Sequence, residues 1–207
     1  MVNNSLRTFL LAAIVVACAR PIVIPQSNQV TVTTTEPARI KLEDLFKQAD
    51  VVALVKTASG DTENYDVAVY KAHVIQGFKG AATGDTIFFG PYVGERLGWE
   101  YIVFVRNVGR PLEPKAASGT SYGTVHYAEI LNEGYSAMMS SYECVFDGKD
   151  TAQKCDYGIR VCTEYIVLPE SVPVFPAKEQ DVPFGCRWVR RSVFVSLLER
   201  HGKGSKW

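Results

Sequence analysis

The chain has 207 residues, of which 47% are apolar, so it can bury a sizeable core and is not globally disordered. Lysine and arginine together number 22, as do aspartate and glutamate, and this zero formal charge argues against a dedicated nucleic-acid-binding protein. The longest apolar run is far shorter than the roughly 20 residues of a membrane-spanning helix, which excludes a polytopic membrane protein.

The N-terminus has the features of an export signal. Arg7 supplies a positive charge, and the apolar run from Phe9 to Ala17 is too short to span a membrane. We therefore predict that residues 1–17 are a signal peptide. Val15-Val16-Ala17-Cys18 resembles the bacterial lipobox, which implies cleavage before Cys18 and attachment of diacylglycerol to its thiol. Several acyl chains, palmitate among them, would anchor the protein stably to a membrane.

The lipobox resemblance also implies a location. Ala19 follows the cysteine where inner-membrane retention in enteric bacteria typically uses aspartate, so we expect the cell envelope, at the outer membrane and periplasm. The alternative is ordinary signal-peptide cleavage, because Ala17-Cys18-Ala19 also fits the A-x-A pattern. That cleavage would release a secreted chain beginning at Arg20.

Residues 18–39 form the next segment, which is rich in proline, threonine, serine and glutamine after the cysteine. This composition is typical of a flexible tether between a lipid and a folded domain. A short strand from Val30 to Thr34 is the alternative for part of it.

Residues 40–131 are predicted to form a β domain after one short helix. Leu42, Leu45, Phe46 and Ala49 recur with helical spacing. Strands are expected at residues 51–55, 65–75, 86–89, 101–105 and 124–131, with a β-bulge near Lys71. The alternation in these runs predicts an inward-facing set: Val52, Leu54, Val67, Val69, Ile87, Phe89, Tyr101 and Val103.

Residues 132–207 are predicted to form a β extension that ends in a helix. Residues 135–146 and 157–168 look like the two arms of a hairpin. Val193, Phe194, Leu197 and Leu198 fit one helical face, with Gly202 as the residue just after the helix. A strand over residues 189–195 is the alternative.

The extension contains four cysteines: Cys144, Cys155, Cys162 and Cys186. An even number in an exported chain indicates two disulfides, for which three pairings are possible. We favour Cys144–Cys155, which would flank the hairpin turn, together with Cys162–Cys186. A zinc site is the rival interpretation, although the chain has no C-x-x-C pair. We expect no metal and no other cofactor.

The sequence offers one weak candidate for catalysis. His126 has Ser121, Tyr122, Glu129 and Ser136 near it, so a serine–histidine–acid arrangement can be imagined. However, the chain has no G-x-S-x-G elbow, and Glu129 would face away from His126 on a regular strand. We therefore expect no enzymatic activity and assign no catalytic residue. A secreted hydrolase using His126 is the alternative.

The first half of the chain resembles a known superfamily. A short helix is followed by Ala49-Asp50-Val51-Val52, later by Gly77-Phe78-Lys79-Gly80, and then by Gly98-Trp99-Glu100-Tyr101-Ile102-Val103-Phe104. This order is similar to that of the tissue-inhibitor-of-metalloproteinases and netrin-module superfamily, including bacterial secreted members. The resemblance spans about 65 residues and implies an OB-like five-stranded barrel. An unrelated small β domain is the alternative.

The chain also departs from that superfamily. Its inhibitors chelate the protease zinc through an N-terminal cysteine held by a disulfide, whereas Cys18 would be acylated and separated from the barrel by a tether. No cysteine lies between residues 19 and 143. We therefore do not expect protease inhibition by that mechanism.

The expected function is a lipid-anchored module that binds a partner in the envelope, either another envelope protein or a glycan. A structural or assembly lipoprotein is a further alternative.

The sequence also gives an expectation about stability. Lys79 lies in a turn of the predicted barrel, so Lys79→Ala is expected to have little effect on stability.

The lipid anchor gives a first testable prediction. The mature protein should incorporate labelled palmitate and partition into detergent, because its thiol carries the lipid, and a Cys18→Ser variant should do neither. A soluble wild-type protein with Arg20 at its N-terminus would instead support ordinary cleavage.

Overall fold

The computed structural model describes residues 38–63, 67–92, 95–110, 126–145, 154–176 and 185–204. Within these ranges, the side chains of residues 61–63, 67, 92, 126–127, 143–145, 154 and 176 are not described. The chain divides into two units, Met1–Thr35 and Glu36–Trp207, and every described residue belongs to the second unit. The predicted signal peptide, Cys18 and nearly all of the predicted tether lie outside the described residues.

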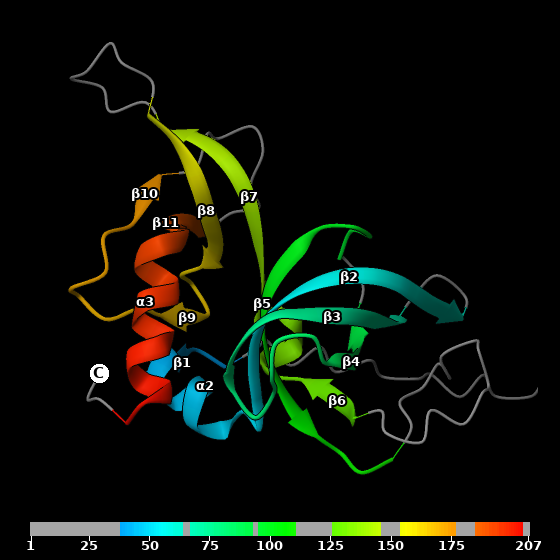
Figure 1. The fold of residues 1–207 in the computed structure, drawn as a ribbon. Coiled ribbons are helices and arrows are strands. Elements are labelled where there is room, and N and C mark those ends of the chain that lie inside the picture. Colours follow the sequence, from blue (N-terminus) through cyan, green and yellow to red (C-terminus); the bar gives the residue numbers. More distant parts are fainter. Residues whose placement is uncertain are drawn as a thin grey trace, which may run out of the picture. The chain divides into compact units, whose positions relative to one another are not determined.

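Five strands form a closed barrel (Figure 1). In chain order they are β2 (Val51–Glu63), β3 (Val67–Lys79), β4 (Thr86–Tyr92), β5 (Glu100–Asn107) and β6 (His126–Ile130). The strands are neighbours in the order β5-β2-β3-β4-β6, and β6 pairs back with β5 to close the sheet. All pairs are antiparallel except β4 with β6. The predicted OB-like five-stranded barrel is therefore confirmed, and closure leaves few exposed sheet edges.

The barrel interior is apolar and built from alternate residues of each strand. Ile87, Phe89, Tyr101 and Val103 point inward as predicted. The prediction was wrong for β2, because Val52 and Leu54 lie in a different core. Strand β2 is buried on both faces, so its unbroken aliphatic run gave no sign of which face is inside. The complete interior cluster is Val51, Ala53, Val55, Ala68, Tyr70, Ala72, Val74, Ile87, Phe89, Tyr101, Val103, Val105, Ala128 and Ile130.

Strand β3 also differs from the prediction. Its inward residues alternate regularly from Ala68 to Val74, so Val69, although buried, is outside the interior cluster, and the side chain of Val67 is not described. No bulge interrupts β3 at Lys71; the extra residue opposite it is Ala58 on β2. Two further irregularities, at Ile75 and Phe78, shift the alternation so that Phe78 faces the second core.

The remaining elements build that second core against the outer wall of the barrel. They are β7 (Ala137–Val145), β8 (Lys154–Cys162), β10 (Phe175–Pro176) and β11 (Cys186–Arg190), which continue the sheet from β5, and the parallel pair β1 (Ile40–Lys41) with β9 (Ile166–Val167). A 3-10 turn (Asn132–Gly134) joins β6 to β7. The helices α2 (Leu42–Gln48) and α3 (Arg191–Gly202) complete it.

Both cores share strands β2 and β5. One face of each strand lines the barrel, while the other packs with the buried residues of α2, α3 and the hairpin β7–β8. The members of the second core are Leu42, Leu45, Phe46, Ala49, Val52, Leu54, Phe78, Ile102, Phe104, Leu131, Met138, Ile159, Val161, Ile166, Val172, Val189, Phe194, Leu197 and Leu198. The predicted apolar faces of the two helices are thus confirmed.

The C-terminal helix ends differently from the prediction. Gly202 is the last residue of α3 rather than the residue after it. A Cβ atom on Gly202 would lie 2.4 Å from the carbonyl oxygen of Phe78. Glycine is therefore required here because the helix approaches the backbone of β3 closely, and not because the chain needs a left-handed conformation.

One corner of the fold depends on Lys79. Its ammonium group donates to the carbonyl oxygens of Phe46 at 3.0 Å and Lys47 at 3.0 Å in the last turn of α2, and to that of the C-cap residue Ala49 at 2.5 Å. Next to it, Gly80 has a φ of 68°, and a Cβ there would lie 2.0 Å from the carbonyl oxygen of Asp50. Lys79 thus caps the C-terminus of α2 and fixes this helix to the barrel.

The structure therefore reverses our expectation for Lys79. We predict that Lys79→Ala lowers the free energy of unfolding by about 1–2 kcal/mol, because three carbonyl groups lose a charged donor. Chemical denaturation measures this loss. Lys203→Ala, at an exposed position after α3, is the matched control and should change stability by less than about 0.5 kcal/mol. Equal effects of the two substitutions would contradict the capping role.

Candidate functional site

The four cysteines of the extension lie on three neighbouring strands. Cys162 on β8 and Cys186 on β11 are opposite each other and form a disulfide, which confirms one predicted pair. Cys155 is also disulfide-bonded, and the residue directly opposite it on β7 is Cys144, whose side chain is not described. Because Cys155, Cys162 and Cys186 are all bonded, a zinc site built from these thiolates is ruled out.

The residues considered around His126 lie partly outside the described side chains. The backbone of His126 lies in β6 opposite Ile87, but its side chain is not described, and Ser121 and Tyr122 lie outside the described residues. Ser136 is fully buried, and its hydroxyl donates to the carbonyl oxygens of Leu131 and Phe104. Ser136 is thus a structural hydrogen-bond donor.

The strongest candidate site is a surface formed by Tyr142, Tyr157 and Arg191, called here the tyrosine–arginine surface. Tyr142 on β7 and Tyr157 on β8 are directly opposite in register and are 61% and 51% exposed. Their ring centroids are 5.4 Å apart with an interplanar angle of 70°, an edge-to-face arrangement. Two large aromatic side chains are thus held together in solvent.

The strand pattern explains why this pair is exposed. Met138 and Ile159, on the same face of the hairpin, are buried in the second core. Because side chains alternate along a strand, Tyr142 lies on the same face of β7 as Met138, and Tyr157 lies on the same face of β8 as Ile159. Helix α3 begins only at Arg191, so its apolar face covers Met138 and Ile159 but does not reach Tyr142 and Tyr157. The apolar face of the hairpin therefore extends beyond its covering helix.

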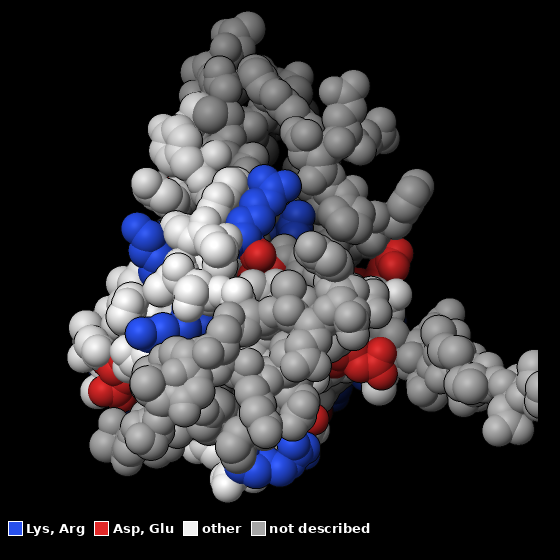
Figure 2. All heavy atoms as spheres, turned by 90° about the vertical axis from the view of Figure 1, so that its right-hand side faces the viewer, with Lys and Arg blue, Asp and Glu red and all other residues white. Residues whose placement is uncertain are grey.

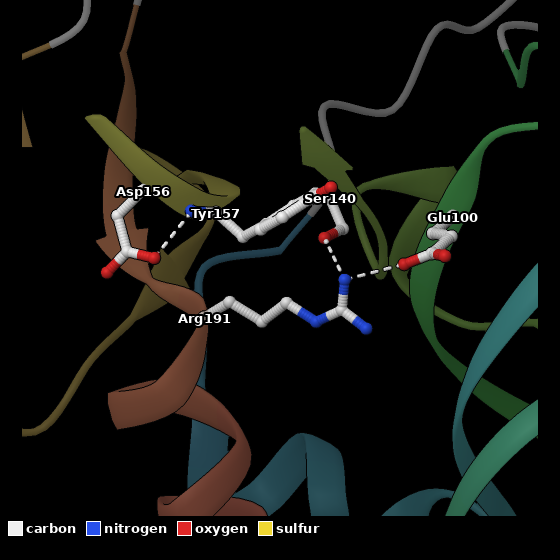
Figure 3. Close-up of polar contacts among 5 residues, drawn as sticks. All are labelled: Glu100, Ser140, Asp156, Tyr157 and Arg191. Atoms are coloured by element: carbon white, nitrogen blue, oxygen red, sulfur yellow. Dashed lines mark hydrogen bonds and ion pairs between the residues drawn. The ribbon is translucent and has the colours of Figure 1, made fainter. Parts of the chain in front are cut away.

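Arg191 fixes one side of this surface (Figure 3). Its guanidinium group donates to the Glu100 carboxylate at 2.6 Å and to the Ser140 hydroxyl at 3.4 Å, and lies 5.5 Å from the ring centroid of Tyr157. The side chains of Arg191 and Glu100 are 24% and 32% exposed, so this ion pair is partly shielded from water. Arg191 therefore joins α3, β5 and β7 and presents an ordered cation beside an exposed ring.

A second exposed cation, Arg190, lies on the other face of the same sheet. Arg190 is 3.7 Å from the Asp156 carboxylate and lies over the ring of Phe175 at 5.9 Å. The Asp156 carboxylate also accepts a hydrogen bond from the backbone N–H of Tyr157 at 2.8 Å. Each of these two arginines is therefore paired with a carboxylate, Arg191 with Glu100 and Arg190 with Asp156.

Charges of both signs are also interspersed on the face shown in Figure 2, over the described part of it. Among the described residues, no group of three His, Cys, Asp or Glu side chains is placed to hold a metal ion. Nor does any helix in that part of the chain have the length and apolarity needed to cross a membrane. Over its described part, this face thus carries interspersed charges rather than one large charged field.

A second chemical feature lies at one end of the barrel. Glu95 is only 9% exposed, and burial raises its pKa to about 7 despite hydrogen bonds from its own backbone N–H and from the hydroxyl of Tyr70. Burial also raises the pKa of Tyr101, whose hydroxyl accepts a hydrogen bond from the backbone N–H of Arg96 at 2.6 Å. A buried carboxyl group of this kind is uncommon unless it is paired.

Sequence reasoning missed both features. Tyr142 and Tyr157 were placed in the hairpin arms, but the sequence gives no sign of where α3 stops covering them. Glu95 lies in a polar stretch beside Gly94 and Gly98, which is typical of an exposed turn. A usable signal was present only for Arg191, which precedes the apolar face of a predicted helix.

Comparisons with known proteins give no relative for this chain. No family model matches it, no curated protein matches it, and no solved structure matches it. The candidate site therefore stands on its own geometry.

The cysteine geometry gives a second prediction about stability. Replacing Cys162 and Cys186 together by alanine should lower the free energy of unfolding by about 2–4 kcal/mol, since the bond closes a loop with a sequence separation of 24. Hydrogen exchange should increase first in β8, β11 and α3, and less in the barrel strands β3 and β4. Detection of reactive thiols at these two positions in the untreated protein would contradict the disulfide.

Proposed function

We propose that the chain is a lipid-anchored protein of a bacterial cell envelope that presents a non-catalytic binding module. The tyrosine–arginine surface is the observation that carries this proposal. Tyrosine, tryptophan and arginine are the residues most enriched among those that contribute strongly to protein interfaces. An exposed tyrosine pair beside an arginine that is already ordered loses little conformational freedom when a partner binds.

The chemistry of this surface favours binding over catalysis. Its described side chains offer two ring faces, one guanidinium group and the Glu100 and Ser140 groups that orient it. These groups include no histidine, and therefore no nucleophile activated by a neighbouring imidazole. Aromatic rings with adjacent hydrogen-bonding groups suit an envelope protein or a glycan, which are the two partners we propose.

The length of the proposed tether sets how far the module could lie from the membrane. Residues 18–37 number twenty, and a chain of that length spans at most about 70 Å when fully extended. Acylation of Cys18 would leave the module free to move over the membrane surface within that distance. We also propose a distant relationship to the netrin-module superfamily, which the barrel topology and the positions of Asp50, Lys79 and Gly80 support.

Site-specific crosslinking in the producing cells tests the binding function. We predict that the full chain with the photoreactive residue p-benzoylphenylalanine in place of Tyr157 forms a discrete adduct, because position 157 lies at the centre of the surface. The same residue at Thr83, in the exposed turn between β3 and β4, is the control and should form none. A Tyr142→Ser substitution in the Tyr157-replaced chain should reduce the adduct.

Binding measurements with purified full chain complete the test. Tyr142→Ser combined with Tyr157→Ser should weaken binding to the captured partner at least about tenfold, while removal of the ring pair lowers stability by no more than about 1.5 kcal/mol. Co-sedimentation with isolated cell-wall glycan distinguishes a glycan from a protein partner. Equal adducts at positions 157 and 83, or unchanged binding by the double variant, would overturn the proposal.

A further inference from the structure

The segment Glu95–Trp99, called here the strap, closes one end of the barrel just before β5. Glu95 points inward, where its carboxyl group meets Tyr70 on β3 and lies close to Tyr101 on β5, and both tyrosines belong to the interior cluster. Its Oε2 atom is buried and has no hydrogen-bond partner among the described residues. The strap thus places a poorly satisfied acid inside an apolar barrel.

Hydrogen bonds with Thr57 and Tyr101 hold the strap in this position. The Thr57 hydroxyl donates to the Arg96 carbonyl at 2.6 Å, the Thr57 N–H donates to the Trp99 carbonyl at 3.0 Å, and the Gly98 N–H donates to the Thr57 carbonyl at 2.8 Å. Tyr101 supplies a further anchor, because its hydroxyl accepts a hydrogen bond from the Arg96 N–H. Leu97 is 55% exposed and Trp99 is 37% exposed. A segment with so little apolar burial opens at low free-energy cost.

The charged groups near Glu95 do not neutralise it. Arg96 is directed to the outside, where its guanidinium group lies 4.9 Å from the centroid of the Trp99 ring. Arg160 on β8 and Arg96 both favour the ionised form of the Tyr101 hydroxyl and so lower its pKa. No described cation lowers the pKa of Glu95 in the same way. Desolvation therefore dominates, and the neutral carboxylic acid is the form that the closed barrel favours.

We infer that the strap is a pH-sensitive latch, which is closed over the barrel end while Glu95 is protonated and opens when Glu95 ionises. Opening transfers the carboxylate to water and uncovers the Tyr70 and Tyr101 hydroxyls. The strap leads directly into Glu100, the partner of Arg191, so the latch adjoins the tyrosine–arginine surface. The inference does not depend on that surface or on the lipid anchor.

The direction of the pH effect follows from the pKa of Glu95. The closed state raises this pKa from 4.5 to about 7, so the closed state retains a proton that the open state has released between these values. The stability of the closed strap is therefore greatest below about pH 4.5 and falls as the pH rises through 7. Each pKa unit changes the opening equilibrium tenfold, which allows an increase of roughly 300-fold at most.

Amide hydrogen exchange of the full chain tests the latch between pH 5 and pH 8.5. The readout is a ratio: the exchange rate of the Arg96 and Gly98 amides in wild type divided by their exchange rate in Glu95→Gln at the same pH. Taking this ratio cancels the intrinsic pH dependence of amide exchange. We expect this ratio to be no more than about 4 at pH 5 and to rise at least about tenfold further above pH 7. Glu170→Gln, at an exposed position, should retain the wild-type profile.

Two results would overturn the latch. One is a wild-type to Glu95→Gln ratio that stays constant over the whole pH range. The other is a transition that persists in Glu95→Gln, which would assign it to another group such as a histidine. Thr57→Val provides a second variant, since it removes an anchor without changing the acid. It should speed the exchange of Arg96 and Gly98 already at pH 5, and normal protection in this variant would also count against the latch.

Discussion

The structure depends on two strands that are buried on both faces. Strands β2 and β5 line the barrel with one face and pack against α2, α3 and the β7–β8 hairpin with the other. A pair of central strands of this kind must be apolar at nearly every position, as residues 51–55 and 101–105 are. If either the barrel or the second core unfolded, one apolar face of β2 and β5 would therefore be exposed to water.

This double burial explains what could be predicted from the sequence. The helix from Leu42 and the positions of the barrel strands along the chain follow from patterns that are local in the sequence. The facing of Val52 and Leu54 does not, because alternation assigns a face only where one side of a strand is polar. Lys79 could not be placed either, since its partners are carbonyl groups about 30 residues earlier in the chain.

The same reasoning applies to the candidate site. The sequence predicts two paired arms that contain Tyr142 and Tyr157, but it does not show that the two rings meet. The register that brings them together depends on how β8 pairs with both β7 and β11. Arg191 joins three elements at the point where β7 leaves β5, so its position is a result of tertiary structure. In Figure 1 the β2–β3 and β7–β8 hairpins leave β5 in different directions from this point.

The two-residue pair β1–β9 has a mechanical consequence for an anchored protein. At the start of the described chain, the Ile40 N–H donates to the Tyr165 carbonyl at 2.8 Å, and α2 follows immediately after β1. A pulling force on the N-terminus would therefore load β9 and α2 first, and both belong to the second core. The barrel closure between β5 and β6 lies outside this first load path, whereas α2 leads directly into the barrel strand β2.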